Sequence, residues 1–92
     1  MNNYEDWKKK QMENPEFRAE YERLRPEFEL IIAMAKARKR ANISLEELAR
    51  RTGISQADIS RIERGTRNPS LSLLNRLAEG MNTHLKIEFV PN

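Results

Sequence analysis

Apolar side chains recur every three or four positions along most of the chain, which is the spacing of an amphipathic helix. Gly, Asn and Pro separate these periodic stretches from one another. Residues 1–14 are less regular, with Tyr4 and Trp7 as their only aromatic side chains, and we expect a mobile arm or a weak helix there. The pattern predicts an all-α protein of about five helices, with a partly helical arm at residues 1–25 and a main domain at residues 26–82.

Prolines and a capping residue mark the first two predicted helices. Asn14 is a suitable N-cap and Pro15 a suitable first residue, so a helix is predicted from there to about Leu24. Pro26 disfavours helical geometry at the residue before it, and we expect the chain to break or kink at that point. A separate helix is then predicted from Pro26 to about Arg40, and it is expected to bury Phe28, Ile31, Ile32 and Ala35.

Two short helices follow, and both begin with the same local signal. Ser44 precedes Glu47 by three residues, and Ser55 precedes Asp58 by three residues, which is the pattern of a capping box. Apolar residues on either side of each cap are expected to pack together as hydrophobic staples: Ile43 with Leu48, and Ile54 with Ile59. Gly53 and Gly65 stand where a left-handed residue ends each helix.

The spacing within residues 45–64 restricts how these two helices pack. Ala49 is small enough for a close crossing, Gly53 permits a turn with positive φ, and Ile59 returns the second helix to the core. This spacing predicts a helix-turn-helix, which presents its second helix to the major groove of DNA. The outward face of that helix holds no acid and consists of Gln56, Ala57, Ser60, Arg61 and Arg64. A structural hairpin without DNA is the alternative, and the acid-free face favours DNA binding.

The chain ends with a further helix and a change of period. Ser70 is the predicted cap of a helix that ends near residues 80–82 and is expected to bury Leu71, Leu74, Leu77, Ala78 and Met81. Leu85, Ile87 and Phe89 then alternate with polar residues, which predicts a strand within residues 83–92. Because a lone strand leaves backbone groups unpaired, we expect it to pair with a second copy in a homodimer. The alternative is a tail packed on its own domain.

Composition and charge narrow the class of protein. A chain of 92 residues without Cys is expected to be one domain from a reducing cytoplasm. No apolar run is long enough to cross a membrane and the first ten residues are polar, so we expect a soluble cytoplasmic protein. Residues 31–67 hold nine Lys and Arg against four Asp and Glu, whereas residues 1–30 hold six against eight. This central basic block is typical of proteins that bind a polyanion such as nucleic acid.

Residues 28–82 resemble the XRE-type, lambda-repressor-like DNA-binding domain. The resemblance lies in the run SLEELARRTGISQADISRIERG and in the following helix NPSLSLLNRLAEGM. It implies a compact bundle of about five helices. In this family an Arg and Glu pair often ties the first helix to the end of the recognition helix, and Arg38 and Glu63 stand at the matching positions. The alternative is two independent surface charges, which contribute little to stability.

Side-chain chemistry and this resemblance together assign roles at the DNA face. Gln56 is predicted to read adenine and Arg61 to read guanine, each through paired hydrogen bonds. Ala57 is short enough to touch a thymine methyl group, and Ser60 can bond to a base or a phosphate. Contacts to phosphate are assigned to Ser44, Ser55, Arg64, Arg67 and Asn68, although Arg64 can also reach a base. Solvated or long-range charge is expected of Lys39, Arg40, Arg50 and Arg51.

Residues 14–91 as a whole resemble HigA-like antitoxins of bacterial type II toxin-antitoxin modules. The broader resemblance rests on NPEFRAEYERLRPEFEL before the domain and HLKIEFVP after it. It implies a dimer that represses its own operon at an inverted repeat and neutralises a small basic toxin, a RelE-like or HigB-like endoribonuclease. The acidic, aromatic lead-in suits such a partner, and the toxin-binding candidates are Trp7, Phe17, Tyr21, Glu16 and Glu20. Alternatively, Phe17, Tyr21 and Leu24 only pack back on the first domain helix.

Enzyme chemistry is not expected from this sequence. The chain has no Cys, and its single His84 alternates with apolar residues in the predicted strand. No set of His, Asp and Glu has the spacing of a metal site, and the three Gly are too scattered for a phosphate-binding loop, so no cofactor is expected. Two other functions remain open: a free-standing or phage-type regulator without a toxin, and a protein-bridging adaptor.

Overall fold

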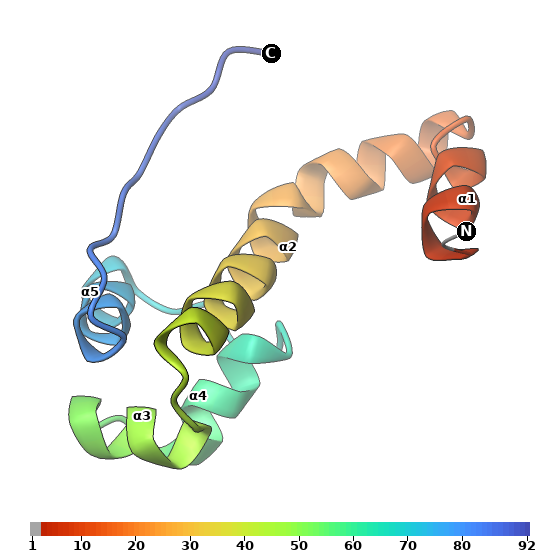
Figure 1. Ribbon diagram of the computed structural model, residues 1–92. Helices are drawn as coiled ribbons and strands as arrows, with labels where there is room; N and C mark the ends of the chain where they lie inside the picture. The colour runs from red at the N-terminus through yellow and green to blue at the C-terminus, as the bar shows by residue number, and fades with distance from the viewer. Residues whose placement is uncertain (1–2) are drawn as a thin grey trace.

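The computed structural model describes residues 3–92, which form five α-helices. These are α1 (Asn3–Gln11), α2 (Pro15–Ala41), α3 (Leu45–Thr52), α4 (Gln56–Glu63) and α5 (Leu71–Gly80). Figure 1 shows α3, α4 and α5 gathered around the C-terminal part of α2, while the N-terminal part of α2 leads away from this bundle to α1. The prediction of an all-α chain with about five helices is confirmed, although α2 to α5 form the bundle and α1 lies outside it. Within the described residues, no helix has the length and apolar character needed to cross a membrane.

One apolar core holds the bundle together. Its fully buried side chains are Leu48 of α3, Ile59 and Ile62 of α4, and Leu77 of α5. Met34, Ile54 and Met81 complete the buried cluster. Full burial of a side chain of this size contributes ~1.5–3 kcal/mol. In so small a domain, these few residues therefore account for much of the stabilisation.

The two helices predicted on either side of Pro26 are one continuous helix, α2. The prediction that a separate helix begins at Pro26 is therefore wrong. Asn14 caps α2 as predicted, because its side chain accepts a hydrogen bond from the backbone N–H of Glu16 (2.9 Å). Pro26 removes one backbone bond but does not forbid helical geometry. The rings of Tyr21 and Phe28 contact each other across it, with centroids 5.2 Å apart. Figure 1 shows α2 bending along its length without interruption.

The face that α2 turns toward the core also differs from the predicted one. Ile32 is 53% exposed and Ala35 is exposed, whereas Met34 is buried. The side chains of α2 that contact the core are spaced by about one turn: Leu30, Met34, Ala37 and Ala41. Phe28 is only half-buried and lies against Tyr21, so it does not mark the core-facing side of the helix.

On α5 most of the predicted core residues are confirmed. Leu77, Ala78 and Met81 are buried, and Leu74 is half-buried. Leu71 is 59% exposed, so its predicted burial is wrong. It is the first residue after the Ser70 cap and lies one turn before Leu74, beyond the edge of the core.

Residues 83–92 contain no helix and no assigned strand in the single chain. Figure 1 shows them as an extended segment that leaves the end of α5. Leu85 is half-buried, whereas Ile87 is 61% exposed and Phe89 is 98% exposed. Strand pairing requires a second copy, so the strand and the homodimer remain predictions.

The predicted serine caps form, but only one of the two hydrogen bonds of each predicted capping box is present. Ser44 and Ser55 each accept a bond from the backbone N–H three residues on, at 3.0 and 3.1 Å. Neither acidic partner accepts a bond from the backbone N–H of its cap, although the Ser55 hydroxyl bonds to the Asp58 carboxylate. Glu47 instead accepts bonds from the guanidinium groups of Arg50 and Arg51. These bonds, of which that from Arg50 has the larger effect, lower the pKa of Glu47 to about 2.

Gly80 allows the end of α5 to approach α3 closely. A Cβ at this position would lie 2.5 Å from Cγ2 of Thr52 and 2.9 Å from Cδ1 of Leu48. Leu48 is fully buried and therefore has little freedom to move aside. The absence of a side chain at residue 80 thus fixes the distance between the two helices.

We expect Gly80→Ala to lower the free energy of unfolding by ~1–3 kcal/mol, because the added methyl group overpacks a site with no free space. Where space is available, the same change in a helix stabilises by ~0.5–1 kcal/mol. The sign of the change therefore tests the close approach, and urea unfolding followed by circular dichroism measures it. Ser72→Ala, on an exposed part of α5, is the control. A Gly80→Ala chain that matches or exceeds the wild type in stability would contradict this packing.

Candidate nucleic-acid interface

A tight turn joins α3 to α4. Gly53 has φ +74°, and its N–H donates to the carbonyl of Ala49 (2.9 Å), which closes the end of α3. Ile54 is buried, and Ser55 caps α4. Left-handed φ costs less for glycine than for most residues with a Cβ, so a glycine suits the first position of this turn. The predicted helix-turn-helix geometry is confirmed.

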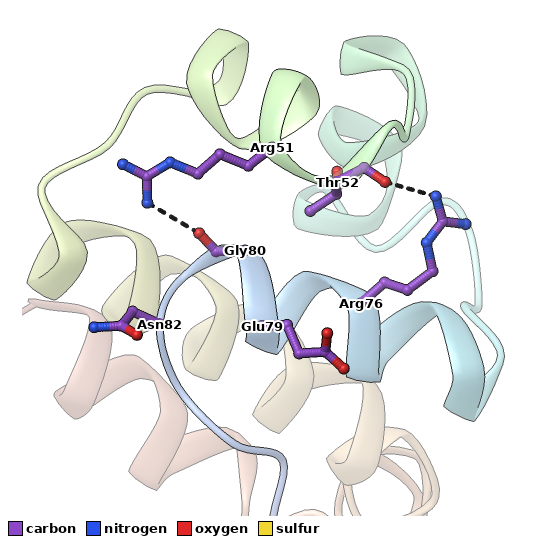
Figure 2. A pocket seen from close by; sticks show the side chains of 6 residues that line it. All are labelled: Arg51, Thr52, Arg76, Glu79, Gly80 and Asn82. Carbon is purple, nitrogen blue, oxygen red and sulfur yellow. Dashed lines mark hydrogen bonds between the residues drawn. The ribbon is translucent and has the colours of Figure 1, made fainter.

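Two arginines tie this turn to α5, as Figure 2 shows. Arg76 of α5 donates to the backbone carbonyl of Thr52 at 2.6 Å, and Arg51 of α3 donates to the backbone carbonyl of Gly80 at 3.2 Å. Each guanidinium lies at the C-terminal end of the other helix, where backbone carbonyls carry partial negative charge. The prediction that Arg51 is only a solvated charge is therefore wrong. Arg76 has no local sequence signal, because its partner lies 24 positions away.

The first domain helix is linked to the end of α4 by a two-pronged ion pair. Arg38 Nε lies 2.8 Å from Glu63 Oε2, and Arg38 Nη2 lies 3.2 Å from Glu63 Oε1. The same guanidinium donates to the carbonyl of Ile43 at 3.3 Å. The two side chains are 28% and 16% exposed, so water screens the pair less than a surface ion pair. The predicted tie between Arg38 and Glu63 is confirmed.

Burial of one side of α4 turns its other side to solvent. Ile59 and Ile62 point into the core and are fully buried. The five predicted DNA-facing residues follow the opposite side, where Ser60 is half-buried and the others are exposed: Gln56, Ala57, Arg61 and Arg64. A helix of this kind has the width that the major groove admits.

An acid lies at the edge of this outward face. Asp58 Oδ1 accepts a bond from Arg61 Nη1, and Asp58 Oδ2 lies 2.9 Å from Arg67 Nη1. A predicted base-reading arginine and a predicted phosphate-contacting arginine thus share one carboxylate. Partial burial works to raise the pKa of Asp58, but the bonds from Arg67 and Ser55 and the charge of Arg61 together hold it below its usual value.

The other phosphate candidates lie around the ends of the two helices. Ser44 and Ser55 both accept the cap bonds. The hydroxyl hydrogen of Ser44 can be donated to a phosphate oxygen, whereas that of Ser55 is directed to the Asp58 carboxylate. Arg64 and Asn68 are exposed in the segment at the end of α4. Their contacts to phosphate remain predictions.

The candidate toxin-binding residues lie where α1 folds back on α2. Trp7 packs edge-on against Phe17, with ring centroids 5.6 Å apart, and Phe17 lies 6.2 Å from Tyr21. Trp7 is still 51% exposed, and Glu16 and Glu20 are exposed nearby on α2. The structure therefore joins the predicted aromatic residues into one row with an exposed edge.

Two of the three predicted dimerisation residues lie beside the start of α5. Leu85 and Ile87 line a shallow groove together with Leu71, which is exposed on α5. Phe89 follows two residues later and is almost fully exposed. The tail and the start of α5 thus carry exposed apolar side chains, those of Leu71, Ile87 and Phe89.

Comparison with known proteins finds a match over the part of the chain that contains α3, the turn and α4. The model of a family described as Helix-turn-helix matches residues 34–87, which is more than half of the chain. Two curated relatives, each named as an uncharacterized HTH-type transcriptional regulator and found in two strains of Mycobacterium tuberculosis, are 34% identical over 53 residues. The match covers 58% of this chain and 38% of each relative, so the chain spans about two fifths of their length. No solved structure gave a significant match.

We expect Arg38 and Glu63 to stabilise the fold as a pair. In a double-mutant cycle with Arg38→Gln and Glu63→Gln, urea unfolding should give a coupling energy of ~1–2 kcal/mol, because the pair is charged, two-pronged and half-buried. The exposed pair of Arg23 and Glu20 on α2 is the control, for which ~0.5 kcal/mol or less is expected. A coupling energy no larger than that of the exposed pair would contradict the role of Arg38 and Glu63.

Proposed function

The chain belongs to the Helix-turn-helix family, and from this membership we propose that it is a sequence-specific DNA-binding transcriptional repressor. The observation that carries the proposal is the geometry of α4. Its inner side is fully buried, its C-terminal end is tied to α2 through Glu63, and its outer side presents exposed polar and basic residues. A helix held in this way meets DNA without further ordering, which reduces the entropic cost of binding.

The exposed residues of α4 suit base recognition. Gln56 offers a donor and an acceptor for adenine, and Arg61 offers several donors for the two acceptors of guanine. Ala57 leaves room for close approach and for a thymine methyl group. Each well-matched pair of hydrogen bonds contributes ~1–3 kcal/mol of discrimination between bases.

Positive charge around the recognition helix supports binding to the DNA backbone. Residues 31–67 carry a net charge of +5, from nine basic and four acidic residues. We assign phosphate contacts to side chains at the ends of α3 and α4: Ser44, Ser55, Arg64, Arg67 and Asn68. Such contacts position a protein on DNA and release counterions, so they make the affinity depend on salt.

We propose that the repressor acts as a homodimer through its C-terminal tail. Ile87 and Phe89 are exposed apolar residues, and exposed Leu71 lies beside the tail on α5. Side chains of this kind are stabilised when a second copy covers them. Two recognition helices related by a twofold axis read an inverted repeat whose half-sites lie ~34 Å apart, one turn of DNA.

The biological setting that we favour is a toxin-antitoxin module, in which this chain is the antitoxin and represses its own operon. The support comes from the resemblance of residues 14–91 to HigA-like antitoxins and from the way α1 folds back on α2. The exposed edge of Trp7 and the acids Glu16 and Glu20 suit a small basic protein. No enzymatic activity and no cofactor are part of this proposal.

The partner is tested by purifying the tagged chain from its own host and measuring the mass and composition of the complex. Two copies with a stoichiometric small basic protein are expected. Two copies alone that still retard promoter DNA would leave a free-standing regulator. A complex that bridges other proteins and does not retard promoter DNA would instead indicate an adaptor and contradict the repressor.

We expect Arg61→Ala and Arg67→Ala to weaken DNA binding in different ways. Loss of a base contact should remove the preference at one base pair of the promoter operator, whereas loss of a phosphate contact should weaken all sequences alike and reduce the slope of affinity against salt by about one counterion. Titrations of the operator and its single-base-pair variants at several salt concentrations measure both effects. An equal loss at every variant for Arg61→Ala would contradict its assignment to a base.

We expect Phe89→Asp together with Ile87→Asp to convert the dimer to a monomer, because a charge buried in the pairing surface is unfavourable. Sedimentation analysis measures the mass, and Lys86→Asp, at an alternate position of the tail, is the control that should stay dimeric. Affinity for the full inverted repeat should fall with dimerisation, while binding to a single half-site changes little. A double variant that remains dimeric would show that another surface joins the copies.

A further inference from the structure

The two carboxylate oxygens of Asp58 contact two different arginines. Oδ1 accepts from Nη1 of Arg61, three residues further along α4, at 2.9 Å. Oδ2 lies 2.9 Å from Nη1 of Arg67, which follows α4 in the chain. The three side chains are between 34% and 53% exposed, so they lie at the protein surface beside the outward face of α4.

This arrangement limits the freedom of a side chain that must be oriented to read a base. A bidentate contact to guanine requires the planar guanidinium group in one orientation. An unrestrained exposed arginine loses rotamer freedom when it adopts that orientation. Asp58 occupies one N–H of Arg61 through Nη1, which leaves Nε and Nη2 to donate elsewhere.

We propose that Asp58 is a positioning residue that orients Arg61 toward its base and couples this contact to the phosphate contact of Arg67. The inference rests on the proposed DNA-binding function and adds a determinant of specificity to it. Because one carboxylate holds both guanidinium groups, a change in one of them alters the position of the other. Base reading by Arg61 and backbone binding by Arg67 are therefore not independent.

A carboxylate beside DNA can also lower the affinity for DNA, because it repels phosphate groups. If Asp58 did nothing else, its removal would raise the affinity for every duplex by a similar factor. If Asp58 positions Arg61, its removal lowers the affinity for the operator relative to unrelated DNA. The ratio of the two affinities separates these cases, because uniform repulsion cancels in it.

The test compares the full-length wild-type chain with Asp58→Ala on the promoter operator and on an unrelated duplex of equal length. We expect the ratio of operator affinity to unrelated affinity to fall about tenfold, which is within the range for one base contact. Glu79→Ala is the matched control, because it also removes one helical carboxylate and contacts Asn75 instead of an arginine. Asp58→Asn keeps the shape of the side chain without its charge, and thermal unfolding confirms that each chain is folded.

A second measurement tests the coupling itself. The operator affinities of Arg61→Ala, Arg67→Ala and the double variant are measured in the wild-type chain and in the Asp58→Ala chain. We expect the two losses to be non-additive when Asp58 is present and additive when it is absent. Additive losses in the wild-type chain, or an unchanged affinity ratio for Asp58→Ala and Asp58→Asn, would overturn the proposal.

The outcomes separate this inference from the function on which it rests. A wild-type chain that binds operator and unrelated DNA equally would overturn the proposed repressor and this inference with it. A wild-type chain that prefers its operator, together with a uniform gain in affinity for Asp58→Ala, would overturn this inference alone.

Discussion

Burial of Ile59 and Ile62 is the interaction on which the rest of the structure depends. The helix that carries them, α4, has only eight residues, and a helix of this length is not stable alone in water. Both side chains are fully buried in a cluster with Leu48 and Leu77, and this contact holds the helix in place. The same contact determines which residues of α4 face outward. Packing in the core therefore sets the orientation of the proposed DNA-reading surface.

Polar contacts then hold the end of α4 and the turn before it, which lie outside the apolar core. Arg38 anchors the end of α4 through Glu63, and Arg76 holds the carbonyl of Thr52 just before the turn. These contacts come from helices α2 and α5, which lie outside the helix-turn-helix unit itself. At the protein surface, Asp58 holds the side chains of Arg61 and Arg67 in the absence of DNA. Fold stability thus depends on the contacts of Arg38 and Arg76, and the proposed DNA recognition depends on a separate pair of arginines beside Asp58.

The sequence predicted the features that depend on neighbouring residues, and it failed for those that depend on distant ones. The cap at Ser44 and the left-handed turn at Gly53 follow from chemistry within a few residues, and both are confirmed. The helix α2 continues through Pro26, and the rings of Tyr21 and Phe28 meet across it, which the local preference of the residue before proline did not predict. The contact of Arg76 and the shared carboxylate of Asp58 depend on the approach of separate segments. At the candidate site, the DNA-facing residues were predictable because helical spacing places them opposite the buried ones.

We propose that α4, held by the core and by its polar contacts, reads a specific DNA sequence. The most direct measurement is selection from a pool of random duplexes with the full-length chain, followed by sequencing of the bound DNA. We expect enrichment of one inverted repeat, with half-sites one turn of DNA, or ~34 Å, apart. Binding of the pool without enrichment of any sequence, or no binding at moderate salt, would contradict it.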